Sequence, residues 1–166
     1  MAKSKLSAVG RAAKMATIGA VKAAGGVAEA VVDAVRDVLL TTVDGAVQVA
    51  VALEQGAAKV ARGAIHAVSD TGEDVGVVAE SALRGTIKAA NEVGGDLGKT
   101  AVAATEAVVK AAEDIGADTG KALKHAVTGA VEAAGEISED AAKAVSDALV
   151  TSVKGAKDVI KSPFKK

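Results

Sequence analysis

The segment Ile87–Asp96 reads IKAANEVGGD, and its pattern returns twice at intervals of 22 residues. It becomes VKAAEDIGAD at Val109–Asp118 and VEAAGEISED at Val131–Asp140. The same register extends back to Val21 and forward to Val153. Because self-similarity at a fixed period is the signature of repeat architectures, the chain is predicted to contain about seven copies of one structural unit.

The 22-residue period predicts a helix. Twenty-two residues make six turns at about 3.67 residues per turn, close to the α-helical value. Projected at this pitch, the apolar residues occupy an arc of roughly 200°. Of the 31 charged residues between Val21 and Val153, 30 fall outside this arc, and Glu54 is the exception. We therefore expect an all-α protein: a long extended amphipathic helix or a few helices, alone or assembled with other helices.

Small side chains make up most of the apolar half of the chain. It contains 40 Ala and 26 Val against 8 Leu, 6 Ile, 2 Met and 1 Phe. Because Ala buries little area, a compact monomeric core is not expected. The 15 glycines between Val21 and Val153 oppose an isolated helix by on the order of 15 kcal/mol relative to alanine. This composition favours a helix that forms when it meets a surface or a partner.

The charges are distributed unevenly, although the net charge is only −1. Residues 1–22 carry five basic residues and no acid, and residues 154–166 carry five Lys and one Asp. Basic ends suit an anionic surface, although they also simply aid solubility. The expected contacts with an anionic surface are Lys3, Lys5, Arg11, Lys14, Lys161, Lys165 and Lys166. A near-neutral balance argues against a specific nucleic-acid partner.

Three regions follow from these patterns: a basic N-terminal segment over residues 1–20, expected to be helical, the repeat region over 21–160, and a basic tail over 161–166. The longest uncharged stretch of the acidic middle, Gly45–Leu53, has nine residues, against the roughly 20 that span a bilayer. The N-terminus shows no secretory signal pattern. We therefore expect a cytoplasmic protein, peripheral to a membrane or lipid particle.

The apolar arc is the predicted contact surface. It is wider than the narrow seam of a two-stranded coiled coil, and a broad apolar side opposite a charged side is typical of interfacial helices. The larger side chains expected to face lipid or a partner are Val21, Val43, Ile65, Ile87, Val93, Leu97, Val109, Ile115, Leu123, Val131, Ile137 and Val153.

The polar side is expected to be an ordinary solvated face. One line of acids at a spacing of 22 consists of Asp70, Glu92, Asp114, Glu136 and Asp158. In another line, Lys99, Lys121 and Lys143 follow Asp96, Asp118 and Asp140 by three residues. Such neighbours are expected to form surface ion pairs worth about 0.2–0.5 kcal/mol each.

No catalytic, cofactor or metal site is expected. The chain lacks Cys, Trp and Tyr, and its two histidines, His66 and His125, are 59 residues apart and expected on the surface. Gly94–Thr100 resembles a phosphate-binding loop, but one residue too few separates its first Gly from the Gly-Lys pair. The pairs Gly72/Gly76, Gly94/Gly98 and Gly116/Gly120 have the spacing that lets helices approach closely. We predict a non-enzymatic protein without a small-molecule substrate.

The period and stretches such as TGAVEAAG at Thr128–Gly135 and VTSVKGAK at Val150–Lys157 resemble known repeats. They are similar to the lipid-binding repeats of synucleins, perilipins and exchangeable apolipoproteins, and to the 11-residue repeats of group 3 late-embryogenesis-abundant proteins. The mean hydropathy of +0.31 is nearer to the lipid-binding group. The resemblance covers nearly the whole chain and implies reversible coating of lipid droplets, vesicles or lipoproteins, or protection of membranes during drying.

The sequence thus favours a protein that coats a lipid or other hydrophobic surface through its Ala/Val face without crossing it, and a homo-oligomer is expected. Two alternatives stay open. One is a structural protein that assembles into a bundle, tube or filament through the same face. The other is a stress protectant of the late-embryogenesis-abundant kind.

Overall fold

The computed structural model describes residues 6–23, 27–44, 46 and 48–161. Within these residues the chain forms eight helices and no strand, which confirms the all-α class. The helices are α1 Ala8–Ala23, α2 Val27–Val43, α3 Val49–Thr71, α4 Val75–Glu92, α5 Leu97–Asp114, α6 Thr119–Ile137, α7 Glu139–Ser152 and α8 Ala156–Lys161. The chain does not continue as one extended helix, because it turns after at most 23 residues and the helices pack together.

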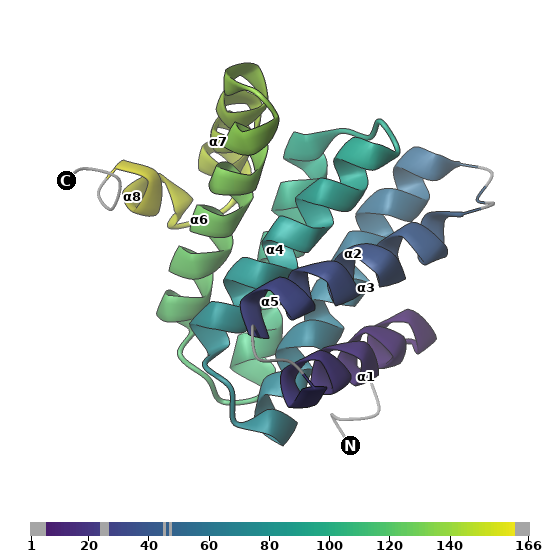
Figure 1. Ribbon diagram of the computed structural model, residues 1–166. Coiled ribbons are helices and arrows are strands. Elements are labelled where there is room, and N and C mark those ends of the chain that lie inside the picture. Colours follow the sequence, from purple (N-terminus) through teal and green to yellow (C-terminus); the bar gives the residue numbers. More distant parts are fainter. Residues whose placement is uncertain (1–5, 24–26, 45, 47, 162–166) are drawn as a thin grey trace.

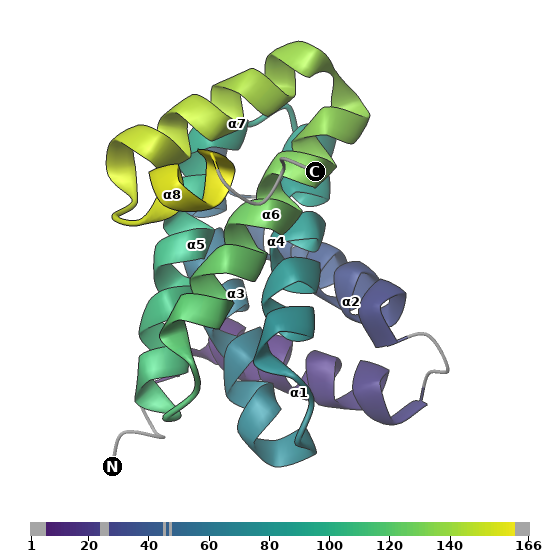
Figure 2. The same ribbon diagram turned by 90° about the vertical axis from the view of Figure 1, so that its left-hand side faces the viewer.

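The helices are arranged in two rows. Each helix contacts the next one along the chain and also the next but one, so that α1, α3, α5 and α7 form one row and α2, α4, α6 and α8 the other. Figures 1 and 2 show the progression from α1 at one end of the molecule to α7 and α8 at the other. Such an array grows by adding neighbours, as in helical repeat proteins, and its end helices have a side without a neighbour.

Turns at a spacing of 22 residues explain why the helices end where they do. Gly72, Gly94 and Gly116 have φ between 71° and 74°, the left-handed conformation that glycine adopts without steric cost. From Val75 to Asp118 each repeat is therefore one 18-residue helix followed by a four-residue turn. The expected helix-face glycine pairs are accordingly wrong in their first members, which lie in these turns.

Aspartates at the same spacing start the next helices. The carboxylate of Asp96 accepts a hydrogen bond from the backbone N–H of Lys99 at 2.9 Å, and Asp118 does the same for Lys121 at 3.0 Å. Asp74 caps α4 in the same way, and Ser138 caps α7. The expectation of surface pairs between these acids and the side chains three residues later is therefore corrected: Asp96 and Asp118 bind backbone donors, as N-cap residues do.

The core contains few large side chains. Its buried apolar residues are 19 Ala and 11 Val, with five Leu and two Ile. The largest, which include Leu39, Leu53, Ile65, Leu83 and Ile87, are fully buried. A compact core thus forms despite the composition, because small side chains let the helix backbones come close together.

Glycines mark the closest crossings between helices of one row. A Cβ atom at Gly85 on α4 would lie 2.5 Å from the carbonyl oxygen of Val32 on α2. A Cβ at Gly63 on α3 would lie 2.0 Å from the carbonyl oxygen of Gly10 on α1. Gly129 on α6 has a similar approach to α4. At these crossings glycine is required by space, so its cost in helix propensity is offset by packing.

Candidate functional site

The predicted contact face forms the interior of the array. Val43, Ile65, Ile87 and Val153 are buried, and only Ile137 is exposed, at 38%. The half-buried members are Val21, Val93, Leu97, Val109, Ile115, Leu123 and Val131. The expectation that these side chains form a free outer surface is therefore corrected for the folded chain: the helices hide their apolar sides against one another.

The basic residues expected to meet an anionic surface have different fates. Arg11 is exposed on α1 and donates from its guanidinium to the carbonyl oxygen of Leu6 at 2.9 Å. Lys14 instead pairs with Asp70 on α3, with 2.9 Å between Nζ and Oδ2. The others, Lys3, Lys5, Lys165 and Lys166 and the side chain of Lys161, lie outside the part of the chain that the structure describes.

Four ion pairs repeat along the two rows and form what we call the charge ladder. In each pair a cation on one helix meets an acid near the end of the helix two further along. The pairs are Lys14–Asp70, Arg36–Glu92 at 2.5 Å, Arg62–Asp114 at 2.7 Å and Arg84–Glu136. The acids predicted to form one solvated line are thus the receiving side of contacts between helices.

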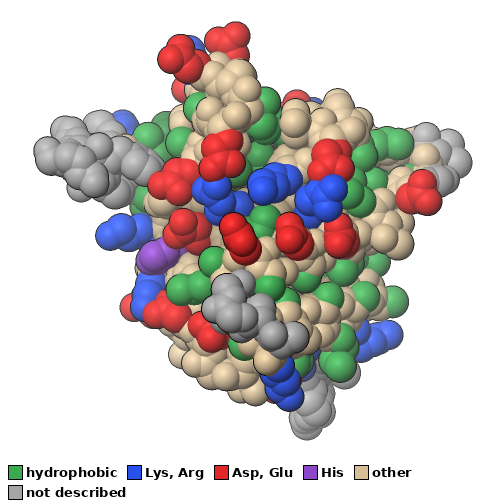
Figure 3. Space-filling view, viewed as in Figure 1, with side chains coloured by type: hydrophobic (Ala, Val, Ile, Leu, Met, Phe, Trp, Pro, Cys, Tyr) green, Lys and Arg blue, Asp and Glu red, His purple; other side chains and the backbone are tan. Residues whose placement is uncertain are grey.

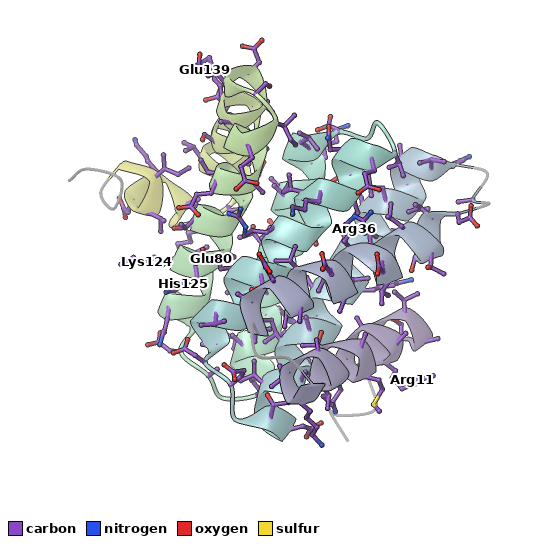
Figure 4. The ribbon with its side chains drawn as sticks, in the orientation of Figure 1. Arg11, Arg36, Glu80, Lys124, His125 and Glu139 are labelled. Carbon is purple, nitrogen blue, oxygen red and sulfur yellow. The ribbon has the colours of Figure 1, made fainter. Side chains whose placement is uncertain are left out.

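Figure 3 shows part of the charge ladder as a short row of Lys and Arg side chains with acidic side chains on both sides. Arg84 adds a second acid, Glu132, at 3.3 Å, and Arg36 is labelled in Figure 4. The cations are less than one third exposed and the acids more so. Pairs of this kind contribute about 0.2–1 kcal/mol each, so the charge ladder sets the register of the helices more than it holds them together.

The charge ladder stops at α5. Twenty-two residues after Arg84 the chain has Glu106, an acid where a cation would continue the pattern. Glu106 is exposed and borders an open groove of about 460 Å³ between α5, α6 and the end of α7. Val109, Leu123 and Val153 form the apolar floor of this groove. The C-terminal end of the array is therefore held by apolar packing of α7 and α8 rather than by further pairs of the charge ladder.

Two polar contacts join α4 and α6 outside the charge ladder. Lys121 Nζ lies 2.7 Å from Asp74 Oδ2. The hydrogen bond from Lys121, and then the one from the Gly76 N–H, hold the pKa of Asp74 below its ordinary value. Nearby, His125 Nδ1 lies 3.1 Å from Glu80 Oε1, and Figure 4 labels both residues. These are contacts between helices, and each side chain is at least one third exposed or close to it.

His66 is buried, which corrects the expectation of a surface histidine. Only 8% of the residue is exposed, and its Nε2 lies 3.8 Å from Asp114 Oδ2, too far for a hydrogen bond. Burial lowers the pKa of His66 below 6.5, and the positive charges of Arg62 and Lys14 lower it further, against the opposing effect of Asp114. The folded chain therefore favours the neutral imidazole at the contact of α1, α3 and α5.

We expect the free energy of unfolding to fall as the pH drops below about 6.5. The unfolded chain takes up a proton at His66 in that range, while the folded chain resists it because of its lowered pKa. Replacing His66→Gln should remove this part of the pH dependence in urea unfolding followed by circular dichroism. The same change at His125 is the control and should leave it in place. Equal pH profiles for His66→Gln and the unchanged protein would contradict the assignment.

The described residues provide no chemistry beyond contacts. No group of three or more His, Asp or Glu side chains able to hold a metal ion occurs among them. None of the helices in the described ranges is both long enough and apolar enough to span a bilayer. Glu54, the single charge predicted on the apolar side, is half-buried in α3. What the arrangement provides is a set of amphipathic helices with a hidden apolar side.

Comparison with known proteins gives no relative. No protein-family model matches the chain, and no curated protein matches it.

Proposed function

We propose that this chain is a non-enzymatic protein that stores an apolar surface inside its helical array and applies it to a lipid or other hydrophobic surface when the rows separate. The observation that supports this most directly is the composition of the core, where Ala and Val provide 30 of the 37 buried apolar residues. Each helix then loses little apolar contact with its neighbours on opening, and recovers it at the hydrophobic surface.

The helices can survive such an opening. Their N-terminal caps are local, because Asp74, Asp96 and Asp118 bind N–H groups of their own helices. The turn glycines also act within one turn. The contacts that must be given up are those between a helix and the next but one, because α6 would lie between α5 and α7 in a single layer. The pairs of the charge ladder lost in this way are partly exposed and individually weak.

A disulfide between α5 and α7 tests the opening. A Cβ at Gly98 lies 3.0 Å from that of Ala148, so Gly98→Cys with Ala148→Cys can form a bridge after a shift of about 0.5 Å. The chain has no cysteine of its own to interfere. We expect the oxidised variant to adsorb to phosphatidylcholine-coated triolein droplets on the order of tenfold more weakly than after reduction, because three helices stay closed.

The matched control is Gly135→Cys with Ala142→Cys, which joins α6 to α7. Its Cβ atoms are 3.9 Å apart, and the two helices are consecutive and stay neighbours in an opened layer. This variant should adsorb equally well oxidised and reduced. Equal adsorption of the oxidised and reduced Gly98/Ala148 variant would refute the opening. Failure of all forms to adsorb, together with association that rises with protein concentration, would favour the self-assembling structural protein instead.

A further inference from the structure

One side of α1 is left uncovered by the rest of the described chain. Six residues at helical spacing are all exposed and form what we call the α1 stripe: Ala8, Arg11, Ala12, Met15, Gly19 and Lys22. Met15 at its centre is 64% exposed, more than any other large apolar side chain of the described residues. The opposite side of α1 buries Ala13 and Thr17 against the array. The stripe is therefore available without any opening of the rows.

The position of α1 explains why this side is free. As the first helix of its row it packs only on α2 and α3, and it crosses α3 where the backbones meet at Gly10 and Gly63. Every later member of the row except α7 has a neighbour on both sides. An exposed apolar side chain between basic ones at such an end is unusual for a purely structural cap, which is normally polar.

The charge of α1 is entirely positive. Residues 1–22 contain no acid, and Lys14 is neutralised by Asp70. Arg11 and Lys22 lie along one border of the α1 stripe, and no ion pair to either is found within the described ranges. Figure 4 shows Arg11 directed away from the body of the molecule. The stripe thus combines an apolar centre with uncompensated positive charge.

We propose that the closed array docks on an anionic phospholipid bilayer through the α1 stripe, with Met15 in the interface and Arg11 and Lys22 against lipid phosphates. Charge complementarity and the apolar centre together identify this occupant, since a basic amphipathic helix lies in the plane of an anionic interface. A hollow of about 370 Å³ beside the stripe, lined mainly by Ala8, Val9, Ala12 and Val38, adds apolar area at the same edge.

The acids of α2 set the direction of approach. Glu29, Asp33 and Asp37 are exposed on this helix, and Figure 3 shows acidic side chains over it. An anionic bilayer is repelled from that face and is met by α1 instead. This inference builds on the proposed function and names its first lipid class, but it uses a face that is exposed before the rows separate.

The test compares two double variants on vesicles of phosphatidylcholine with and without phosphatidylserine. Met15→Gln with Lys22→Gln changes two exposed side chains of the α1 stripe. Val150→Gln with Lys124→Gln changes an equally accessible apolar residue and an exposed lysine at the other end of the molecule. We expect the first to bind phosphatidylserine vesicles on the order of tenfold more weakly, since one basic contact alone is worth about fivefold, and the control to change less than about twofold.

Binding should also weaken with added salt and be absent from pure phosphatidylcholine vesicles. Equal binding of both double variants, or equal binding to the two vesicle types, would overturn the proposal. Soluble polyglutamate that binds with the same dependence on Met15 and Lys22 would show that the occupant is an acidic peptide instead. The oxidised Gly98/Ala148 variant separates the two proposals: docking should persist in this closed form, so its loss there would refute docking on α1, whereas unchanged droplet adsorption would refute only the opening.

Discussion

Replacing Gly85→Ala is expected to lower the free energy of unfolding by about 2–3 kcal/mol. The new Cβ would lie 2.5 Å from the Val32 carbonyl oxygen and 3.0 Å from the Val35 Cβ, so α2 and α4 must move apart. Because the obstacle is helix backbone, no side-chain rotation relieves it. The gain in helix propensity, about 1 kcal/mol, offsets only part of this cost. Urea unfolding followed by circular dichroism measures the change.

The matched control for this prediction is Gly19→Ala on α1. A Cβ at Gly19 meets nothing within 4 Å, so the same substitution acts only through helix propensity. It should raise the free energy of unfolding by about 0.5–1 kcal/mol. If Gly85→Ala stabilises the chain as Gly19→Ala does, the close crossing of α2 and α4 is wrong.

These two glycines show what the sequence can and cannot reveal. The helical period and the separation of polar from apolar residues follow from the repeat, because every helix restarts in the same register after its turn. The turns themselves carried a readable signal: Gly72 precedes Asp74 by two residues, as Gly116 precedes Asp118, and such Gly and Asp positions are typical of a helix end and a helix start. The projection as one continuous helix concealed it.

Contacts between helices could not be read from the repeat. The acids of the charge ladder were visible as one line, but each partner lies 52 or 56 residues earlier, on a helix separated by another helix. Nothing in a single helix reveals this pairing. Likewise, an amphipathic pattern shows which side avoids water but not what covers it, so Ile65 and Ile87 were correctly placed on the apolar side and wrongly placed outside.

Replacing Leu83→Ala is expected to have the largest effect on stability, a loss of about 3–4 kcal/mol. Leu83 is fully buried on α4 and is one of only five buried leucines. Its surroundings are mainly Ala and Val on helices whose backbones already touch at Gly85 and Gly129. Such surroundings have few flexible side chains able to fill the space, so most of the cavity would stay open.

The same change at Leu123 is the control, because this leucine is half-buried on the floor of the open groove. Its removal should cost about 1 kcal/mol, since the groove already admits water. Similar small losses for Leu83 and Leu123 would mean that the interior is loosely filled and that packing does not keep the rows together. A large loss at Leu83 alone would place most of the closing energy in a few large side chains. Alanine and valine would then supply a wide apolar surface that separates easily once those few contacts are exchanged for a hydrophobic surface.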